Sequence, residues 1–168
     1  MIQRISPFLW FDDQAEEAAE LYVSIFENSR IVSVSRRGEA DSGDPAMSVS
    51  FELDGLQMQA FNGGPGFRFT EAISLMVRVE TQEEIDRVWD RLTDGGEPSR
   101  CGWLKDRYGL SWQIVPPVLH ELLADPDPER AGRTMMAMLA MTKLDIAALQ
   151  AAADGTGPAE GTAAQTSG

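Results

Sequence analysis

Four polar side chains recur at matching places in the two halves of the chain. Ser6 corresponds to Ser74, and Gln59 corresponds to Gln113. Serine hydroxyls and glutamine amides hydrogen-bond to neutral polar groups, but they lack the charge, imidazole or thiolate that transition metals prefer. The only histidine, His120, cannot form a metal site alone. The four residues therefore predict a metal-free set of hydrogen-bonding groups, which either hold a ligand or bond to one another.

Aromatic side chains cluster around the same positions. With the two-residue period of a strand, Phe8 and Trp10 share the face of Ser6, and Phe61 shares the face of Gln59. A wall of rings beside polar groups suits a flat, partly apolar ligand. The alternative is that these rings belong to an ordinary core.

The glycine-rich stretch Gly63–Gly66 follows one of the expected strands. A phosphate or S-adenosylmethionine site of this kind needs a helix N-terminus after the glycines, whereas the residues from Phe67 lead towards another strand. We therefore interpret the stretch as a turn. Phe67 and Phe69, in the same loop, either close over a ligand or pack down.

Cys101 is the single cysteine. It would be a nucleophile if His120 or Lys105 lowered the pKa of its thiol, but a lone cysteine is more often a small buried apolar group. The neighbouring cluster Lys105–Arg107 is expected to form a solvated turn.

The charge balance limits the possible partners. Lys and Arg total 14 against 27 Asp and Glu, giving a formal charge of −13. Nucleic acid and anionic membranes attract cationic surfaces, so neither is an expected partner. The apolar segment Ile5–Phe11 is too short to span a membrane, and no targeting segment is recognised. A lone cysteine precludes an internal disulfide, and we expect a cytoplasmic protein.

The chain contains an internal duplication. Matched positions differ by 68 in residue number at the start of each copy, as in 5 and 73, 12 and 80, and 16 and 84. Near the end of each copy, Gly55–Gln59 matches Gly109–Gln113 at an offset of 54. The second copy is therefore shorter in its loops.

Each copy predicts the order βαβββ. The first copy should contain a strand at 5–11, a helix capped by Asp12 or Asp13 and ending at Asn28, and strands at 30–36, 48–53 and 56–61, with a hairpin turn at Asp54-Gly55. The second should contain a strand at 73–79, a helix capped by Thr81 and ending at Gly95, and strands at 97–101, 103–106 and 110–115.

Helices are expected after the second copy. They span 117–123, then Asp127 to Met141 or Thr142, and finally 146–153 behind an Asp145 cap. Met135, Met136, Met138 and Met141 spread around the second of these, which predicts burial on more than one side, at a dimer seam. The segment 154–168 has no bulky apolar residue and is expected to be disordered.

Several stretches together are similar to a known family. They are Pro7–Asp12, Phe61–Pro65, Ala72–Ser74, Cys101–Asp106 and Tyr108–Pro116, with the helix start at Asp125–Pro128. They resemble the PhnB-like branch of the vicinal oxygen chelate superfamily, whose members are often labelled 3-demethylubiquinone-9 3-methyltransferase-like. The superfamily also includes glyoxalase I, extradiol dioxygenases and bleomycin-resistance proteins.

The resemblance implies an α+β fold in which two βαβββ modules form an eight-stranded mixed open cup or barrel, plus C-terminal helices. It also implies a homodimer. In active members a metal is held by His or Glu from the first and last strand of each module, and the matching positions here are Ser6, Gln59, Ser74 and Gln113. Because all four lack a metal-binding side chain, we expect no metal and no other cofactor.

The expected function is small-molecule binding in a metal-free cup of unassigned activity. The ligand-binding residues would be Ser6, Phe8, Trp10, Gln59, Phe61, Ser74 and Gln113, with catalytic residues unknown. One alternative is a vicinal oxygen chelate enzyme of lyase, dioxygenase or transferase type acting on a small metabolite. Another is a dimeric interaction protein whose cup is filled by its own side chains. The modules should occupy 1–116, divided near 66, with the C-terminal helices at 117–153.

Overall fold

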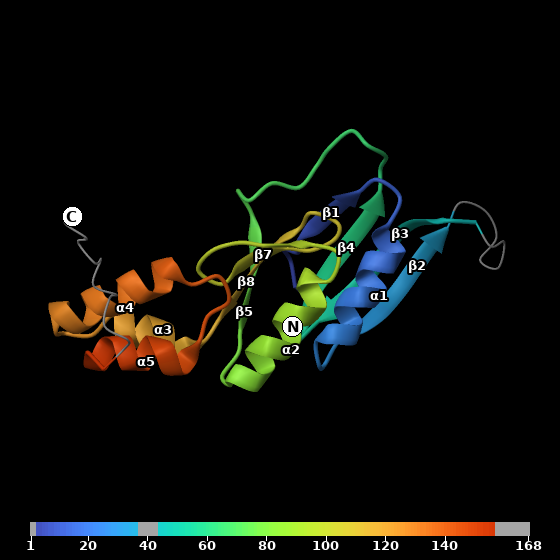
Figure 1. The fold of residues 1–168 in the computed structure, drawn as a ribbon. Coiled ribbons are helices and arrows are strands. Elements are labelled where there is room, and N and C mark those ends of the chain that lie inside the picture. Colours follow the sequence, from blue (N-terminus) through green and yellow to red (C-terminus); the bar gives the residue numbers. More distant parts are fainter. Residues whose placement is uncertain (1–2, 37–43, 157–168) are drawn as a thin grey trace, which may run out of the picture. The chain divides into compact units, whose positions relative to one another are not determined.

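The computed structural model describes residues 3–36 and 44–156. Within these residues the chain forms eight strands and five helices (Figure 1). In chain order they are β1 (Phe8–Phe11), α1 (Ala15–Ile25), β2 (Arg30–Arg36), β3 (Ala46–Leu53), β4 (Leu56–Asn62), β5 (Ser74–Arg78), α2 (Gln82–Thr93), β6 (Glu97–Pro98), β7 (Trp103–Lys105), β8 (Ser111–Val115), α3 (Pro117–Leu123), α4 (Pro128–Ala140) and α5 (Ile146–Asp154). Each strand and helix expected from the sequence is present, with shifts of a few residues at some ends.

The strands form two open four-stranded sheets with the same internal order. The first sheet runs β1-β4-β3-β2 and the second runs β5-β8-β7-β6. In both, the opening strand of the module pairs with its closing strand. The predicted α+β fold with two βαβββ modules is therefore confirmed, and its eight strands are divided equally between the two sheets.

The described residues fall into two compact units. One contains residues 3–36, 44–74, 91–96 and 105–111, and the other contains residues 75–90, 97–104 and 112–156. The first unit therefore holds the whole first sheet together with the turn that precedes β8.

In the first unit, α1 packs on one face of the first sheet. Strand β1 is parallel to β4, and the other neighbouring strands are antiparallel. The turn at Asp54 and Gly55 has positive φ at both residues, as a tight hairpin of this kind requires. The buried residues of α1 are Ala15, Ala18, Ala19, Tyr22 and Ile25. Their helical spacing places them on the sheet-facing side, so the opposite face of the sheet is left for other contacts.

The N-terminus of α1 is capped from another strand. The predicted cap at Asp12 or Asp13 is wrong, because Gln14 occupies the cap position and makes no side-chain cap bond. Instead, the backbone N–H of Ala15 donates to Asn62 Oδ1 at 2.8 Å, and Asn62 Nδ2 donates to the carbonyl of Ala46 at 2.9 Å. The cap therefore ties the start of α1 to the end of β4.

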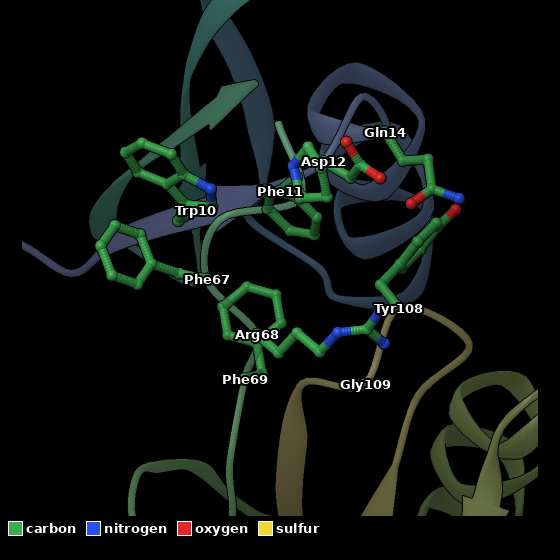
Figure 2. A pocket seen from close by; sticks show the side chains of 10 residues that line it. Trp10, Phe11, Asp12, Gln14, Phe67, Arg68, Phe69, Tyr108 and Gly109 are labelled. Atoms are coloured by element: carbon green, nitrogen blue, oxygen red, sulfur yellow. The ribbon is translucent and has the colours of Figure 1, made fainter. Parts of the chain in front are cut away.

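Asp106 is a buried carboxylate, with 3% of its surface exposed. It accepts the hydroxyl of Tyr22 at 2.6 Å through Oδ2, and the backbone N–H groups of Tyr108 and Leu110 at 2.9 and 3.1 Å through Oδ1. The expected solvated turn is therefore wrong at Asp106, because this side chain is the acceptor for both the helix and the turn. Tyr108 and Gly109 are held in that turn (Figure 2).

The second unit contains most of α2 and all of the C-terminal helices. The hydroxyl of Thr81 accepts the N–H of Glu84 at 3.2 Å, which confirms the predicted cap of α2. Asp127 and Asp145 cap α4 and α5 in the same way, by accepting the N–H groups of Glu129 and Ala148. None of the helices in residues 3–36 and 44–156 is both long and apolar enough to cross a membrane.

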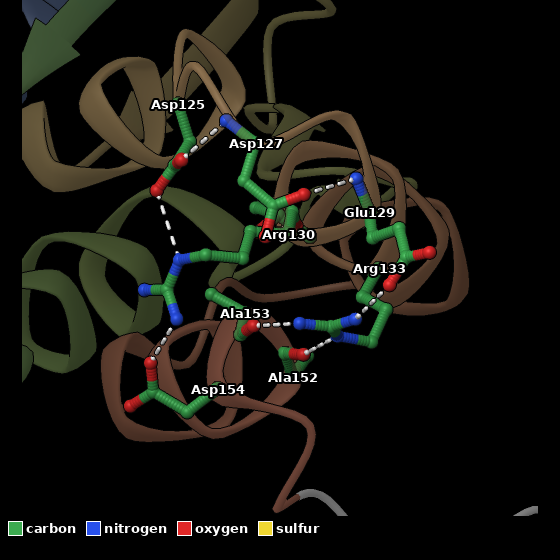
Figure 3. A network of polar contacts seen from close by, with 9 residues as sticks. Asp125, Asp127, Glu129, Arg130, Arg133, Ala152, Ala153 and Asp154 are labelled. Carbon is green, nitrogen blue, oxygen red and sulfur yellow. Dashed lines mark hydrogen bonds and ion pairs between the residues drawn. The ribbon is translucent and has the colours of Figure 1, made fainter.

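Two arginines of α4 hold the end of α5 (Figure 3). Arg130 pairs with Asp125 at 2.9 Å and with Asp154 at 2.6 Å. Arg133 donates to the carbonyls of Ala152 and Ala153, which are acceptors that a helix C-terminus leaves without partners. Gly155 then ends α5 in the left-handed conformation. The predicted disordered tail lies mostly at residues 157–168, outside the described residues.

The methionines of α4 differ from the prediction. Val115, Leu119, Leu144 and Leu149 form the core beneath these helices, with Met138 and Met141 packed against it. Met135 and Met136 are 41% and 66% exposed, so within its unit α4 is buried on one side only.

We expect Asp106→Ala to lower the free energy of unfolding by about 3 kcal/mol, because the Tyr22 hydroxyl and two backbone N–H groups would lose their acceptor inside the fold. Urea denaturation followed by circular dichroism would measure the loss. Asp94→Ala is the matched control. It also removes one negative charge, but it breaks only the exposed pair with Arg107 and should cost under about 1 kcal/mol. Equal losses would contradict a central role for Asp106.

Candidate functional site

The open face of the first sheet carries four of the predicted ligand-binding residues. Burial alternates along β1, where Leu9 and Phe11 are buried beneath α1 while Phe8 and Trp10 lie on the other face. Phe8 pairs with Gln59 and Trp10 pairs with Phe61 across β1 and β4. Paired residues share a face, so the structure brings Phe8, Trp10, Gln59 and Phe61 together.

The three rings are in direct contact. The ring centroid of Phe61 lies 5.3 Å from Trp10 in an edge-to-face arrangement and 6.0 Å from Phe8. These separations are typical of favourable aromatic pairs. Phe61 therefore joins the two rings of β1 into one aromatic surface.

The rows continue into serines that the sequence reasoning did not assign to the site. Gln59 pairs with Ser50 and Ser50 with Ser33, while Ser48 pairs with Phe61. The alternation of serine with apolar residues along β3 was the signal that could have found them. The open face thus combines aromatic rings on β1 and β4 with uncharged hydroxyls on β3 and β2.

The other predicted residues lie elsewhere. Ser6 is exposed before β1, and the strand partner of Gln59 is Phe8 rather than Ser6. Ser74 begins β5, and Gln113 lies in the middle of β8 in the second unit; both are half-buried. A ring formed by Ser6, Gln59, Ser74 and Gln113 remains a prediction.

A pocket of about 290 Å³ lies in the first unit, at the end of β1 (Figure 2). We call it the Trp10 pocket. In Figure 2, Trp10 and Phe67 lie on one side, with Gln14 and Tyr108 on the other. The residues lining it are Trp10, Phe11, Asp12, Gln14, Pro65, Phe67, Arg68, Phe69, Tyr108 and Gly109.

The glycine-rich loop positions Trp10. The indole Nε1 donates to the carbonyl of Gly64 at 2.9 Å. A Cβ atom added at Gly63 would collide with the six-membered ring of the indole, so only glycine fits there. The interpretation of this loop as a turn therefore acquires a purpose, because the absent side chain leaves space for Trp10.

The two loop phenylalanines also pack against β1. Phe67 lies edge-on to Trp10 at 5.0 Å, and Phe69 lies edge-on to Phe11 at 5.2 Å. Tyr108 approaches Phe11 at 6.0 Å from the turn held by Asp106. Rings from three separate segments thus form the walls of the pocket.

The Tyr108 hydroxyl has its own acceptor. It donates to Glu17 Oε1 at 2.7 Å. Burial of the ring, followed by the hydrogen bond to the Glu17 carboxylate, raises the pKa of Tyr108 well above its ordinary value. Tyr108 is therefore a neutral wall of the pocket at physiological pH.

Comparison with known proteins places the chain in a family. Residues 3–115 match the family model described as 3-demethylubiquinone-9 3-methyltransferase. A Bacillus cereus PhnB protein, described provisionally as a 3-demethylubiquinone-9 3-methyltransferase, is 38% identical, with a TM-score of 0.62 over 68% of this chain and 99% of that one. The chain belongs to this PhnB-like family of the vicinal oxygen chelate superfamily.

Two further structures share the fold of this PhnB-like chain. Protein PA1353 from Pseudomonas aeruginosa is 19% identical, with a TM-score of 0.56 over 68% of this chain and 98% of that one. The fosfomycin resistance protein FosX from Listeria monocytogenes is 19% identical, with a TM-score of 0.52 over 74% of this chain and 100% of that one. No curated protein matches the chain. The family match ends at residue 115, so α3 to α5 lie beyond it.

The donor atoms of the PhnB-like chain do not fit the metal of active superfamily members. The corresponding positions hold two serines and two glutamines, which offer only neutral oxygen and amide donors. Within residues 3–36 and 44–156, no group of three or more His, Cys, Asp or Glu side chains lies close enough to hold a metal ion. We derive no chemistry through a metal at these positions.

Cys101 and His120 lie in the second unit. Cys101 is half-buried with a φ of 59°, and its backbone N–H donates to the carbonyl of Met141. His120 is exposed on α3. Lys105, the other residue considered for activating the thiol, forms an ion pair with Glu71. The nucleophile hypothesis therefore gains no support from these contacts.

We expect Gly63→Ala to destabilise the protein by about 2 kcal/mol, because the new methyl group would displace the Trp10 indole from its packed position. Gly66→Ala is the control, since a Cβ atom there meets open space in the same loop. Urea denaturation of both variants would measure the difference. Equal stability of the two variants would contradict the role assigned to Gly63.

The two tyrosines of the chain provide a pH test. Burial, then the neighbouring Asp106 carboxylate, raises the pKa of Tyr22 well above its ordinary value of 10.0, and Tyr108 is raised as described. Because both folded-state pKa values lie above the unfolded value, the stability from the protonated hydroxyls is complete below about pH 10 and is lost as the pH rises through the folded-state values. We expect the free energy of unfolding to fall above about pH 10.

Tyrosinate absorbance should accordingly appear in one step with the loss of circular dichroism during an alkaline titration. The denaturant-unfolded chain serves as control and should titrate near pH 10, the ordinary value. Ionisation of both tyrosines near that pH with the fold intact would show that neither is protected.

Proposed function

We propose that this PhnB-like chain binds a small, flat organic molecule without using a metal ion. The observation that carries the proposal is the position of Trp10, which belongs both to the aromatic face of β1 and β4 and to the Trp10 pocket. Its indole is fixed by Gly64 and by two ring contacts. A side chain held in this way needs little ordering when a ligand stacks on it.

The proposed contacts follow from the chemistry of the open face. Phe8, Trp10 and Phe61 would stack on the ligand, and the exposed amide of Gln59 would hydrogen-bond to it. Ser6, Ser74 and Gln113 are proposed as further hydrogen-bonding residues. The pocket volume of about 290 Å³ is close to the lower end of small-molecule sites.

Two other functions remain to be compared with this one. A vicinal oxygen chelate enzyme would turn over a small metabolite at the same face, with or without a metal. A dimeric interaction protein would have its cup filled by its own side chains and would bind no small molecule. The Trp10 pocket favours ligand binding over the second of these, because space lined by aromatic residues is already formed.

A homodimer and a cytoplasmic location are part of the proposal, as is the division into modules at 1–116 and helices at 117–153. Light scattering on the purified protein would give its mass in solution. A mass of one chain, 18.4 kDa, would remove the dimer from the proposal without affecting the pocket.

A thermal-shift screen with quinones and flat aromatic drugs tests the binding function. A compound present at 100 times its Kd stabilises the folded state by about 2.7 kcal/mol and raises the melting temperature. We expect Trp10→Ala to weaken every such compound at least about tenfold, because the central stacking surface is lost. Phe26→Ala is the control, since Phe26 lies at the C-terminal end of α1 whereas the pocket lies at its N-terminal end.

Three results would contradict the proposal. Unchanged binding in Trp10→Ala would mean that the site lies elsewhere. Binding or turnover only after addition of Zn, Mn, Ni or Fe would favour the enzyme and overturn the metal-free site. The absence of any binding compound would favour the interaction protein.

A further inference from the structure

Two opposite charges line the Trp10 pocket without neutralising each other. Arg68 and Asp12 both contribute to its wall. Neither side chain takes part in an ion pair within 4.0 Å among the described residues, although most other cations of this acidic chain do. The guanidinium of Arg68 is therefore available to a ligand.

The chemistry of Arg68 specifies the group that it would bind. A guanidinium is always charged and presents a planar fork of N–H donors, which matches the two oxygens of a carboxylate. It is the only cation that lines the pocket. An anionic ligand group would therefore be drawn to this part of the wall and kept away from Asp12.

The remaining walls specify a ring. Trp10 and Phe67 meet edge-to-face, and so do Phe11 and Phe69, which leaves ring faces and edges rather than flexible side chains around the space. Tyr108 adds a further ring, and because its hydroxyl donates to Glu17 it stays uncharged beside an anion.

We infer that the Trp10 pocket takes an aromatic carboxylate, with its ring among Trp10, Phe67 and Phe69 and its carboxylate on Arg68. This inference rests on the proposed binding function and adds the chemical class of the ligand. The net charge of the protein does not prevent such binding, because exposed charges are largely screened beyond about 8 Å at physiological ionic strength.

Naphthoate and naphthamide provide the test, because they share ring and shape but only naphthoate is charged. Isothermal titration would measure both with the full chain. We expect naphthoate to bind about tenfold more tightly than naphthamide, as is typical of a hydrogen bond to a charged group. Arg68→Gln should abolish this preference and leave naphthamide binding unchanged, while Arg68→Lys should retain part of it.

Arg100→Gln is the matched control, because it removes one exposed cation that does not line the pocket. It should leave the preference intact. Equal binding of the two probes by the natural chain, or a preference that survives in Arg68→Gln, would overturn the carboxylate assignment while leaving small-molecule binding standing. If neither probe bound but other flat compounds did, the assignment would also fail. If nothing bound, the proposed function itself would fail.

Discussion

The buried carboxylate of Asp106 is the contact on which the first unit depends. It joins the hydroxyl of Tyr22 on α1 to two backbone N–H groups of the turn before β8, residues more than 80 positions from Tyr22 in sequence. Because a buried carboxylate without partners is strongly unfavourable, all three donors must stay in place. That requirement fixes Tyr108, and with it one wall of the Trp10 pocket.

The candidate site is built on a module that the chain uses twice but does not use identically. In the first copy, the end of the last strand leads into the glycine-rich loop that accommodates Trp10. In the second copy, β8 leads directly to Pro116 and α3, and no such loop follows. The C-terminal helices lie beyond the family match, so they extend the PhnB-like chain rather than form part of its shared fold.

Much of the fold was predictable because its signals are local. The Asp54-Gly55 hairpin and the caps at Thr81, Asp127 and Asp145 each depend on residues a few positions apart. The cap of α1 was not predictable in this way, since its acceptor, Asn62, lies 47 residues along the chain. The exposure of Met136 likewise depends on which neighbours pack on α4, which periodicity alone does not specify.

For the site, the sequence by itself determined the repeated βαβββ order, the neutral residues at the metal positions of related proteins, and the shared face of Phe8 and Trp10. These follow from residue type and from the two-residue period of a strand. Only the tertiary structure decided that Arg68 and Tyr108 line one pocket with Trp10. The physical reason is that this proximity is produced by long-range hydrogen bonds and by a glycine-sized space, and neither leaves a periodic pattern in the chain.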